Sequence, residues 1–110
     1  MLKVPAFVKV TDMNFRTYDL ALEFHTMVTN EIKSKNLKGN MKNQLERALL
    51  SIPLNLTEGA SRTSMKERKR FYNIALGTFR EVHCILKLSR MTNLEAQADK
   101  LGAHLYRLSH

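Results

Sequence analysis

The segment 64-SMKERKRFYNIALGTFREVHCILKLSRM-91 has the pattern of one long amphipathic helix and carries much of the chain's positive charge. Ser64 and Glu67 have the S-x-x-E spacing of a capping box, which marks a helix start. Apolar residues then return every three or four positions, the period of a helix with one buried face. We therefore predict a helix over residues 65–91. Its predicted core face comprises Phe71, Ile74, Ala75, Thr78, Val82, Ile85, Leu86 and Ser89.

Three further segments have the same period, and they predict helices over residues 15–34, 41–58 and 94–108. Asn40 is the expected N-cap of the second of these helices, and Gly59 is the expected residue just past its end. Pro53 lies inside the second helix, where it removes a backbone donor and should cause a kink. Four amphipathic helices with short connections predict an all-α fold, an antiparallel up-down-up-down four-helix bundle.

The length of 110 residues suits one domain over residues 1–110, with residues 1–14 as an N-terminal arm. The single cysteine, Cys84, cannot form an internal disulfide. No apolar stretch reaches the roughly 18 residues that a membrane helix needs, and the first residues lack a signal-peptide pattern. These features predict a cytoplasmic protein without a membrane partner.

Positive charge is concentrated in one part of the chain. The net charge is +8, and residues 62–90 alone hold eight Lys or Arg against two Asp or Glu. Such a basic segment favours a polyanionic partner, and we expect nucleic acid, with RNA favoured over DNA. Tyr72 and Asn73 are expected to add stacking or polar contacts. The predicted contact residues are Arg62, Lys66, Lys69, Arg70, Arg80, Lys87 and Arg90. The alternative is a solvated helix face with no such role.

The sequence offers little for catalysis. No histidine pairs with another His or Cys at helical spacing, and no nucleophile elbow or phosphate-binding loop is present. His83 is expected to be exposed and Cys84 to lie in or beside the core. Glu58 is expected to anchor the loop after its helix, and Gly77 to allow close approach of a neighbouring helix. We therefore expect no metal, no cofactor and no enzymatic activity.

Some apolar residues exceed the needs of one core face. Pro53, Leu54 and Leu56 crowd the second predicted helix, and Tyr106 lies off the apolar seam of the fourth. Additional apolar faces on a bundle predict self-association.

Residues 41–91 resemble a known bacterial family, the four-helix-bundle proteins encoded in intervening sequences of 23S ribosomal RNA genes. The matching residues are Gln44-Leu45-Glu46-Arg47-Ala48, Ser51 to Gly59, Arg62, Ser64, Glu67, Arg70-Phe71, Ile74 to Thr78, and Glu81. Leu56-Thr57 stands where the family usually has Ile-Ala, and Thr78 where it usually has Ser.

The resemblance implies a four-helix bundle that assembles into a ring, usually a homopentamer. It also implies a relationship to the accessory variability determinant proteins of diversity-generating retroelements, which bind nucleic acid and a reverse transcriptase. Two functions are therefore expected. The first is an oligomeric bundle that binds structured RNA through the basic helix. The second is an accessory scaffold that docks a protein such as a retroelement reverse transcriptase.

Overall fold

The computed structural model describes residues 12–110, and all regular secondary structure in that range is helical. The four helices are α1 (Asp12–Ser34), α2 (Gly39–Ser61), α3 (Met65–Leu88) and α4 (Glu95–Ser109). The predicted all-α class is confirmed. The predicted arm covered residues 1–14, of which residues 12–14 belong to α1, whereas residues 1–11 lie outside the described part.

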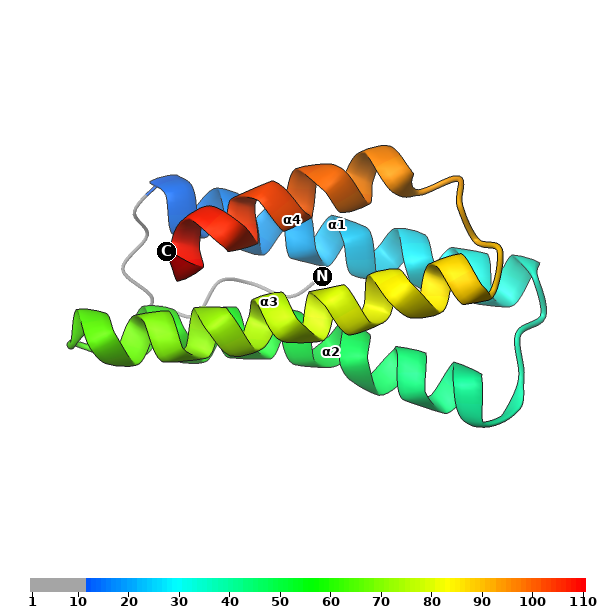
Figure 1. Ribbon diagram of the computed structural model, residues 1–110, viewed down its shortest axis with the longest axis horizontal. Helices are drawn as coiled ribbons and strands as arrows, with labels where there is room; N and C mark the ends of the chain where they lie inside the picture. Colours follow the sequence, from blue (N-terminus) through cyan, green and yellow to red (C-terminus); the bar gives the residue numbers. More distant parts are fainter. Residues whose placement is uncertain (1–11) are drawn as a thin grey trace.

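The helices alternate in direction and form two layers, with α1 and α4 above α2 and α3 in Figure 1. Each helix packs against the next one in sequence, and α4 returns to pack against α1. The contact between α2 and α3 is the most extensive of the four. This is the up-down-up-down arrangement that short connections between amphipathic helices produce.

The core is a single cluster to which every helix contributes. Phe24 from α1, Leu49 from α2, Val82 from α3 and Leu101 from α4 are all almost completely buried. Burial of a side chain of this size contributes about 1.5–3 kcal/mol each, so the cluster is the main source of stability. The apolar seam predicted for the fourth helix, which comprised Leu94, Ala98, Leu101, Leu105 and Leu108, is buried at the first four positions and half-buried at Leu108.

The prediction for the second helix was wrong at both ends. The N-cap is Lys38, whose side chain makes no capping hydrogen bond, and Asn40 is already helical. Gly59 also lies within α2, which continues to Ser61. Tyr72 of α3 packs directly on Gly59: a Cβ at this position would lie 2.7 Å from Cε1 of Tyr72, so the contact requires a glycine here.

The predicted core face of the third helix was rotated from the observed one. Ala75, Val82, Ile85 and Leu86 are buried as predicted, but Ile74 is 41% exposed. Phe71, Thr78 and Ser89 are only half-buried. The core instead receives Tyr72, Leu76 and Phe79.

Two helices end in the same type of capping motif. At the end of α1, Leu37 N–H donates to Ile32 O at 3.1 Å and Asn36 N–H donates to Lys33 O at 3.2 Å. At the end of α3, Met91 N–H donates to Leu86 O and Arg90 N–H to Lys87 O, at 2.8 and 3.1 Å. These are the two bonds of a Schellman motif, which requires a left-handed residue.

The left-handed residues are Asn36, with φ of 54°, and Arg90, with φ of 57°. Because Arg90 takes this position, α3 ends at Leu88 and not at the predicted residue 91.

Pro53 lies inside α2, as predicted, and it is buried together with Leu56. The kink expected there stays a prediction. Leu54, between them, is 56% exposed, and Tyr106 of α4 is 51% exposed. Of the four apolar residues that the sequence assigned to an extra surface, Leu54 and Tyr106 therefore lie on it, and Pro53 and Leu56 belong to the interior.

Candidate nucleic-acid interface

The predicted contact residues lie along one helix and at its two ends. Arg62 caps the end of α2, Arg90 follows α3, and the other five belong to α3. All are exposed except Lys69, which is half-buried. The exposed members are Arg62, Lys66, Arg70, Arg80, Lys87 and Arg90.

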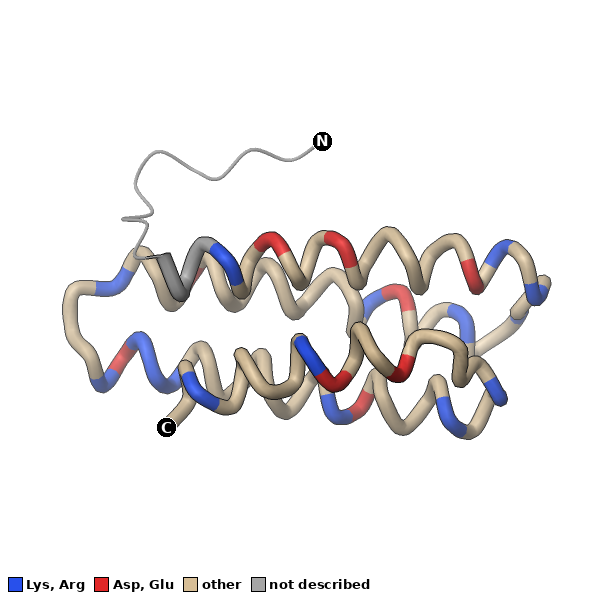
Figure 2. Tube along the Cα trace, turned by 90° about the horizontal axis from the view of Figure 1, so that it is seen from above, with Lys and Arg blue, Asp and Glu red and all other residues tan. Residues whose placement is uncertain are grey.

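Four of these cations share one side of α3. At about 100° per residue, Lys66, Lys69, Arg80 and Lys87 fall within about 60° of one another around the helix axis. At about 1.5 Å per residue, the distance from Lys66 to Lys87 is about 32 Å. In Figure 2, Lys and Arg gather most densely where α2 turns into α3, and they are more widely spaced along the rest of α3.

The turn between α2 and α3 fixes two arginines in place. The guanidinium carbon of Arg62 lies over the Phe71 ring at 4.8 Å from its centroid, and that of Arg70 lies at 4.6 Å. Each arginine also pairs with a carboxylate on its own side of the turn. Arg62 Nη2 donates to Glu58 Oε2 at 2.8 Å, and Arg70 Nε donates to Glu67 Oε2 at 3.1 Å. Glu58 thus binds an arginine beyond its helix, as expected.

The same turn holds other cations by hydrogen bonds to backbone. Arg68 Nε donates to Arg62 O at 2.6 Å, which ties the start of α3 to the end of α2. Lys69 Nζ donates to His110 O at 3.0 Å, which ties α3 to the end of the chain's last helix. Ser64 caps α3 by accepting from Glu67 N–H at 3.2 Å, as the capping box predicts.

The remaining predicted contact residues make no ion pair within the described part of the chain. No carboxylate oxygen among the described side chains, residues 16–110, lies within 4.0 Å of Lys66, Arg80, Lys87 or Arg90. Their charges are therefore not neutralised by a direct ion pair, and they remain available to a polyanion.

His83 and Cys84 lie opposite to expectation. His83 is half-buried, with Nε2 at 3.0 Å from Glu95 Oε1 and its ring centroid 5.6 Å from that of Phe79. Cys84 is exposed. The two expectations were wrong because the core face of α3 is centred on Phe79, and His83 follows Phe79 by one helical turn.

Tyr72 does not contribute to the surface. It is only 3% exposed, because it packs against Gly59 in the core, so the predicted stacking role was wrong. Asn73 is exposed, and its amide donates to Lys69 O at 3.0 Å, within its own helix.

Gly77 has no close neighbour among the described residues. A Cβ added at this position would have no heavy atom within 4 Å, so the expected approach of a neighbouring helix is absent here. Gly77 lies on the exposed side of α3 between Asn73 and Arg80.

Sequence reasoning missed the role of Phe71, and it placed Arg68 in the basic cluster at the start of the third helix but not among the predicted contact residues. Phe71 was assigned to the core, whereas its ring lies under two guanidinium groups. The signal was present locally, since an aromatic residue directly follows five consecutive charged residues that end at Arg70. Arg62 is nine positions before Phe71, and only the geometry of the turn brings them together.

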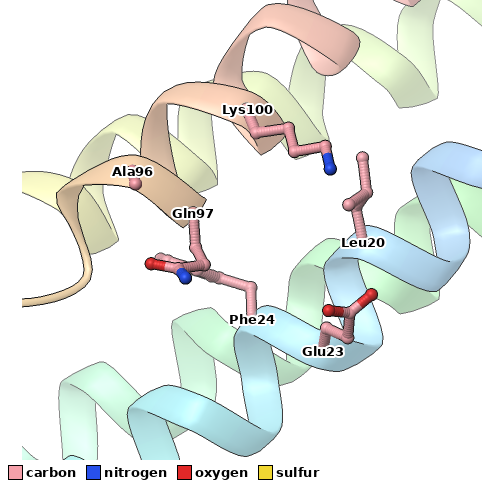
Figure 3. A pocket seen from close by; sticks show the side chains of 6 residues that line it. All are labelled: Leu20, Glu23, Phe24, Ala96, Gln97 and Lys100. Atoms are coloured by element: carbon pink, nitrogen blue, oxygen red, sulfur yellow. The ribbon is translucent and has the colours of Figure 1, made fainter.

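A small hollow of about 280 Å³ lies between α1 and α4 (Figure 3). Leu20 and Phe24 line it from α1, and Ala96 and Gln97 line it from α4. Glu23 and Lys100 add one carboxylate and one amine, and they are the two ionisable side chains among these six lining residues.

The pKa of His104, on α4, lies below its ordinary value of 6.5, chiefly because burial disfavours the charged imidazole. The positive charges of Arg107, Arg16 and Lys100 lower it further. Its Nδ1 lies 3.4 Å from the hydroxyl of buried Thr17, on α1.

Within residues 12–110, no three His, Cys, Asp or Glu side chains are placed to hold a metal ion. None of α1 to α4 combines the length and the apolar character needed to cross a membrane.

Comparison with known proteins identifies the family. Residues 12–109 match the model of the 23S rRNA-intervening sequence proteins, and the chain belongs to that family. No curated protein and no solved structure gives a significant match.

Proposed function

We propose that this protein binds structured RNA through the basic side of α3 and has no catalytic role. The observation that carries the proposal is that Lys66, Arg80, Lys87 and Arg90 are exposed without a carboxylate within 4.0 Å among residues 16–110. The family's name, which refers to intervening sequences of 23S rRNA, supports RNA as the partner.

The form of the basic surface suggests what it recognises. Lys and Arg side chains on a helix contact phosphates, which position a protein but carry no sequence information. A-form RNA has a deep, narrow major groove that hides its base edges. We therefore expect recognition of duplex shape with little discrimination between sequences.

The test is a fluorescence anisotropy titration with an rRNA-derived hairpin between about 50 and 200 mM salt. Each phosphate contact should contribute about −0.7 to −0.9 to the slope of log affinity against log salt. The double variant Lys69→Glu with Arg80→Glu should lose binding. The matched control is Lys100→Glu with Arg107→Glu, the same charge change on α4, and it should bind like wild type.

Two outcomes would contradict this proposal. If the α4 control loses as much affinity as the α3 variant, net charge alone governs binding. If wild-type protein binds neither RNA nor DNA at low salt, the alternative applies, an accessory scaffold that docks a protein such as a reverse transcriptase.

We also propose that the chain forms a homo-oligomer, with a pentameric ring as the expected form. The support is a stripe on the exposed side of α3 with the three-and-four spacing of a coiled-coil seam. It consists of Ile74, Gly77, Glu81, Cys84 and Leu88, all exposed. Leu50 and Leu54 form a second exposed apolar pair on α2, 48% and 56% exposed. A head-to-tail ring needs two different faces on one chain.

Light scattering tests this assembly. The expected mass is several times the 12.7 kDa of one chain. Ile74→Ser with Leu88→Ser should lower it, while Met65→Ser with Tyr106→Ser, at two other exposed sites, should not. A monomeric wild type would refute the assembly. A ring would place several basic surfaces on one RNA and raise its avidity.

A further inference from the structure

Contacts within the chain fix the arginine side chains of the α2–α3 turn in position. Electrostatic attraction of an anion alone would not require such fixing. An exposed arginine normally samples many rotamers, and fixing it on binding costs conformational entropy. Here Arg62 and Arg70 both lie over the Phe71 ring, at 4.8 and 4.6 Å. Contact of a guanidinium with an aromatic face is favourable for its charge and its flat shape.

The carboxylates of Glu58 and Glu67 orient these arginines but use only some of their N–H donors. A guanidinium has five N–H donors, and each arginine uses one nitrogen for its carboxylate, Nη2 in Arg62 and Nε in Arg70. The two arginine side chains are 43% and 58% exposed, so solvent screens both ion pairs. The remaining donors are open to a further anion.

The charge of the turn as a whole attracts anions. Residues 62–70 hold five Lys or Arg and a single acid, Glu67. Arg68 is also fixed, by its hydrogen bond to Arg62 O. Lys66 lies among them and has no carboxylate within 4.0 Å in the described part of the chain.

We propose that Phe71 is a positioning residue that holds Arg62 and Arg70 as a fixed phosphate-binding pair, here called the arginine clamp. Its ligand is the phosphodiester group of a nucleic-acid backbone, because planar guanidinium forks match phosphate oxygens in pairs. The inference rests on the proposed RNA-binding function and deepens it. Phe71 touches no RNA in this arrangement, since its ring is occupied by the two arginines.

The main test is a double-mutant cycle on binding of the rRNA-derived hairpin. Phe71→Leu removes the ring, keeps every charge and should weaken binding by about tenfold, the effect of freeing two side chains. In a background of Arg62→Gln with Arg70→Gln, Phe71→Leu should cause no further loss. Phe71→Tyr, which keeps the ring, should bind like wild type. Tyr106→Leu, which removes an exposed ring on α4, is the control.

The cycle separates positioning from general damage to the fold. If Phe71 only braces the bundle, Phe71→Leu lowers the melting temperature, and any loss of affinity is the same in both backgrounds. That result would overturn the clamp. The clamp would also be overturned if wild type binds the hairpin and Phe71→Leu binds it with the same affinity.

A second probe keeps the clamp testable if RNA binding itself fails. Inorganic pyrophosphate at millimolar concentration should shift the NMR signals of the Arg62 and Arg70 Nε–H groups in wild type, and should shift them much less in Phe71→Leu. Shifts without any RNA binding would leave the clamp standing and refute the proposed function. Absence of shifts in wild type would refute the clamp.

Discussion

Two pairs of cations, one at the start of α3 and one farther along it, carry equal charge but differ in how firmly the chain holds them. At the start of α3, Arg62 and Arg70 are held by an aromatic ring and by two carboxylates. Farther along it, Arg80 and Lys87 are exposed and make no ion pair within the described residues. The side chains of the first pair have lost conformational freedom before a partner binds, whereas those of the second pair must lose it on binding. Equal charge therefore does not imply equal contribution to affinity.

The largest expected effect compares the two pairs directly. Arg62→Gln with Arg70→Gln and Arg80→Gln with Lys87→Gln each remove two charges, so each should reduce the log–log salt slope by about 1.4–1.8. The pair at the start of α3 should cost about tenfold more affinity at about 150 mM salt, because its hydrogen bonds are preorganised. Anisotropy titrations of both double variants decide this. Equal losses would mean that charge alone determines binding.

Two glycines provide the next comparison, in stability. Gly59→Ala places a Cβ 2.7 Å from the Tyr72 ring, where α2 and α3 meet, and should destabilise the fold by about 1–3 kcal/mol. Gly77→Ala places its Cβ where no described heavy atom of its own chain lies within 4 Å, and it should stabilise the fold of the single chain by up to about 1 kcal/mol. Urea unfolding measures both. A tolerated Gly59→Ala would show that Tyr72 has room to move.

Arg90 should give a smaller effect at the far end of α3. Its left-handed backbone, with φ of 57°, is unfavourable for any residue with a Cβ. Arg90→Gly should therefore raise thermal stability by about 1 kcal/mol. Arg90→Ala also removes the charge but keeps the strained conformation. If both variants were equally stabilised, charge repulsion among the cations would be the cause and backbone strain would not.

The smallest expected effect is a pH dependence of stability. It comes from His104 on α4, away from both ends of α3. Burial and nearby cations lower the pKa of His104, so below its ordinary value of 6.5 the unfolded chain takes up the proton more readily than the folded one. Stability should fall as the pH drops from about 7.5 through that range, and it should level off below the folded pKa. His104→Gln should flatten the curve measured by thermal unfolding.

The helices were predictable because their apolar period is strong, but the buried face of α3 was not. Two apolar stripes run along this helix, one through Phe71 and Ile74 and one through Tyr72 and Phe79. A tyrosine is a poor candidate for a core when only its type is known. Which of the two stripes faces the core depends on two glycines of other helices. Gly59 makes room for Tyr72, and Gly102 makes room for Phe79. The Cε2 atom of Phe79 would lie 2.9 Å from a Cβ added at Gly102.

The candidate site was predictable as a set of charges and not as a geometry. Lys66, Arg80 and Lys87 are exposed because lysine and arginine are rarely buried unpaired, so their type alone places them on the surface. The partnership of Arg62 with Phe71 depends on how tightly the chain turns between two helices. No periodic pattern encodes that distance.

The arginine clamp also has a consequence for the order of folding. Its two arginines, its ring and both carboxylates come from residues 58–71, a local helical hairpin joined by a three-residue connection. Short loops close at small entropic cost, and helical hairpins with local contacts form early. The hairpin is therefore expected to be structured in the folding transition state, before α4 returns to α1. Stopped-flow kinetics of Gly59→Ala should then show a slower folding rate with little change in unfolding.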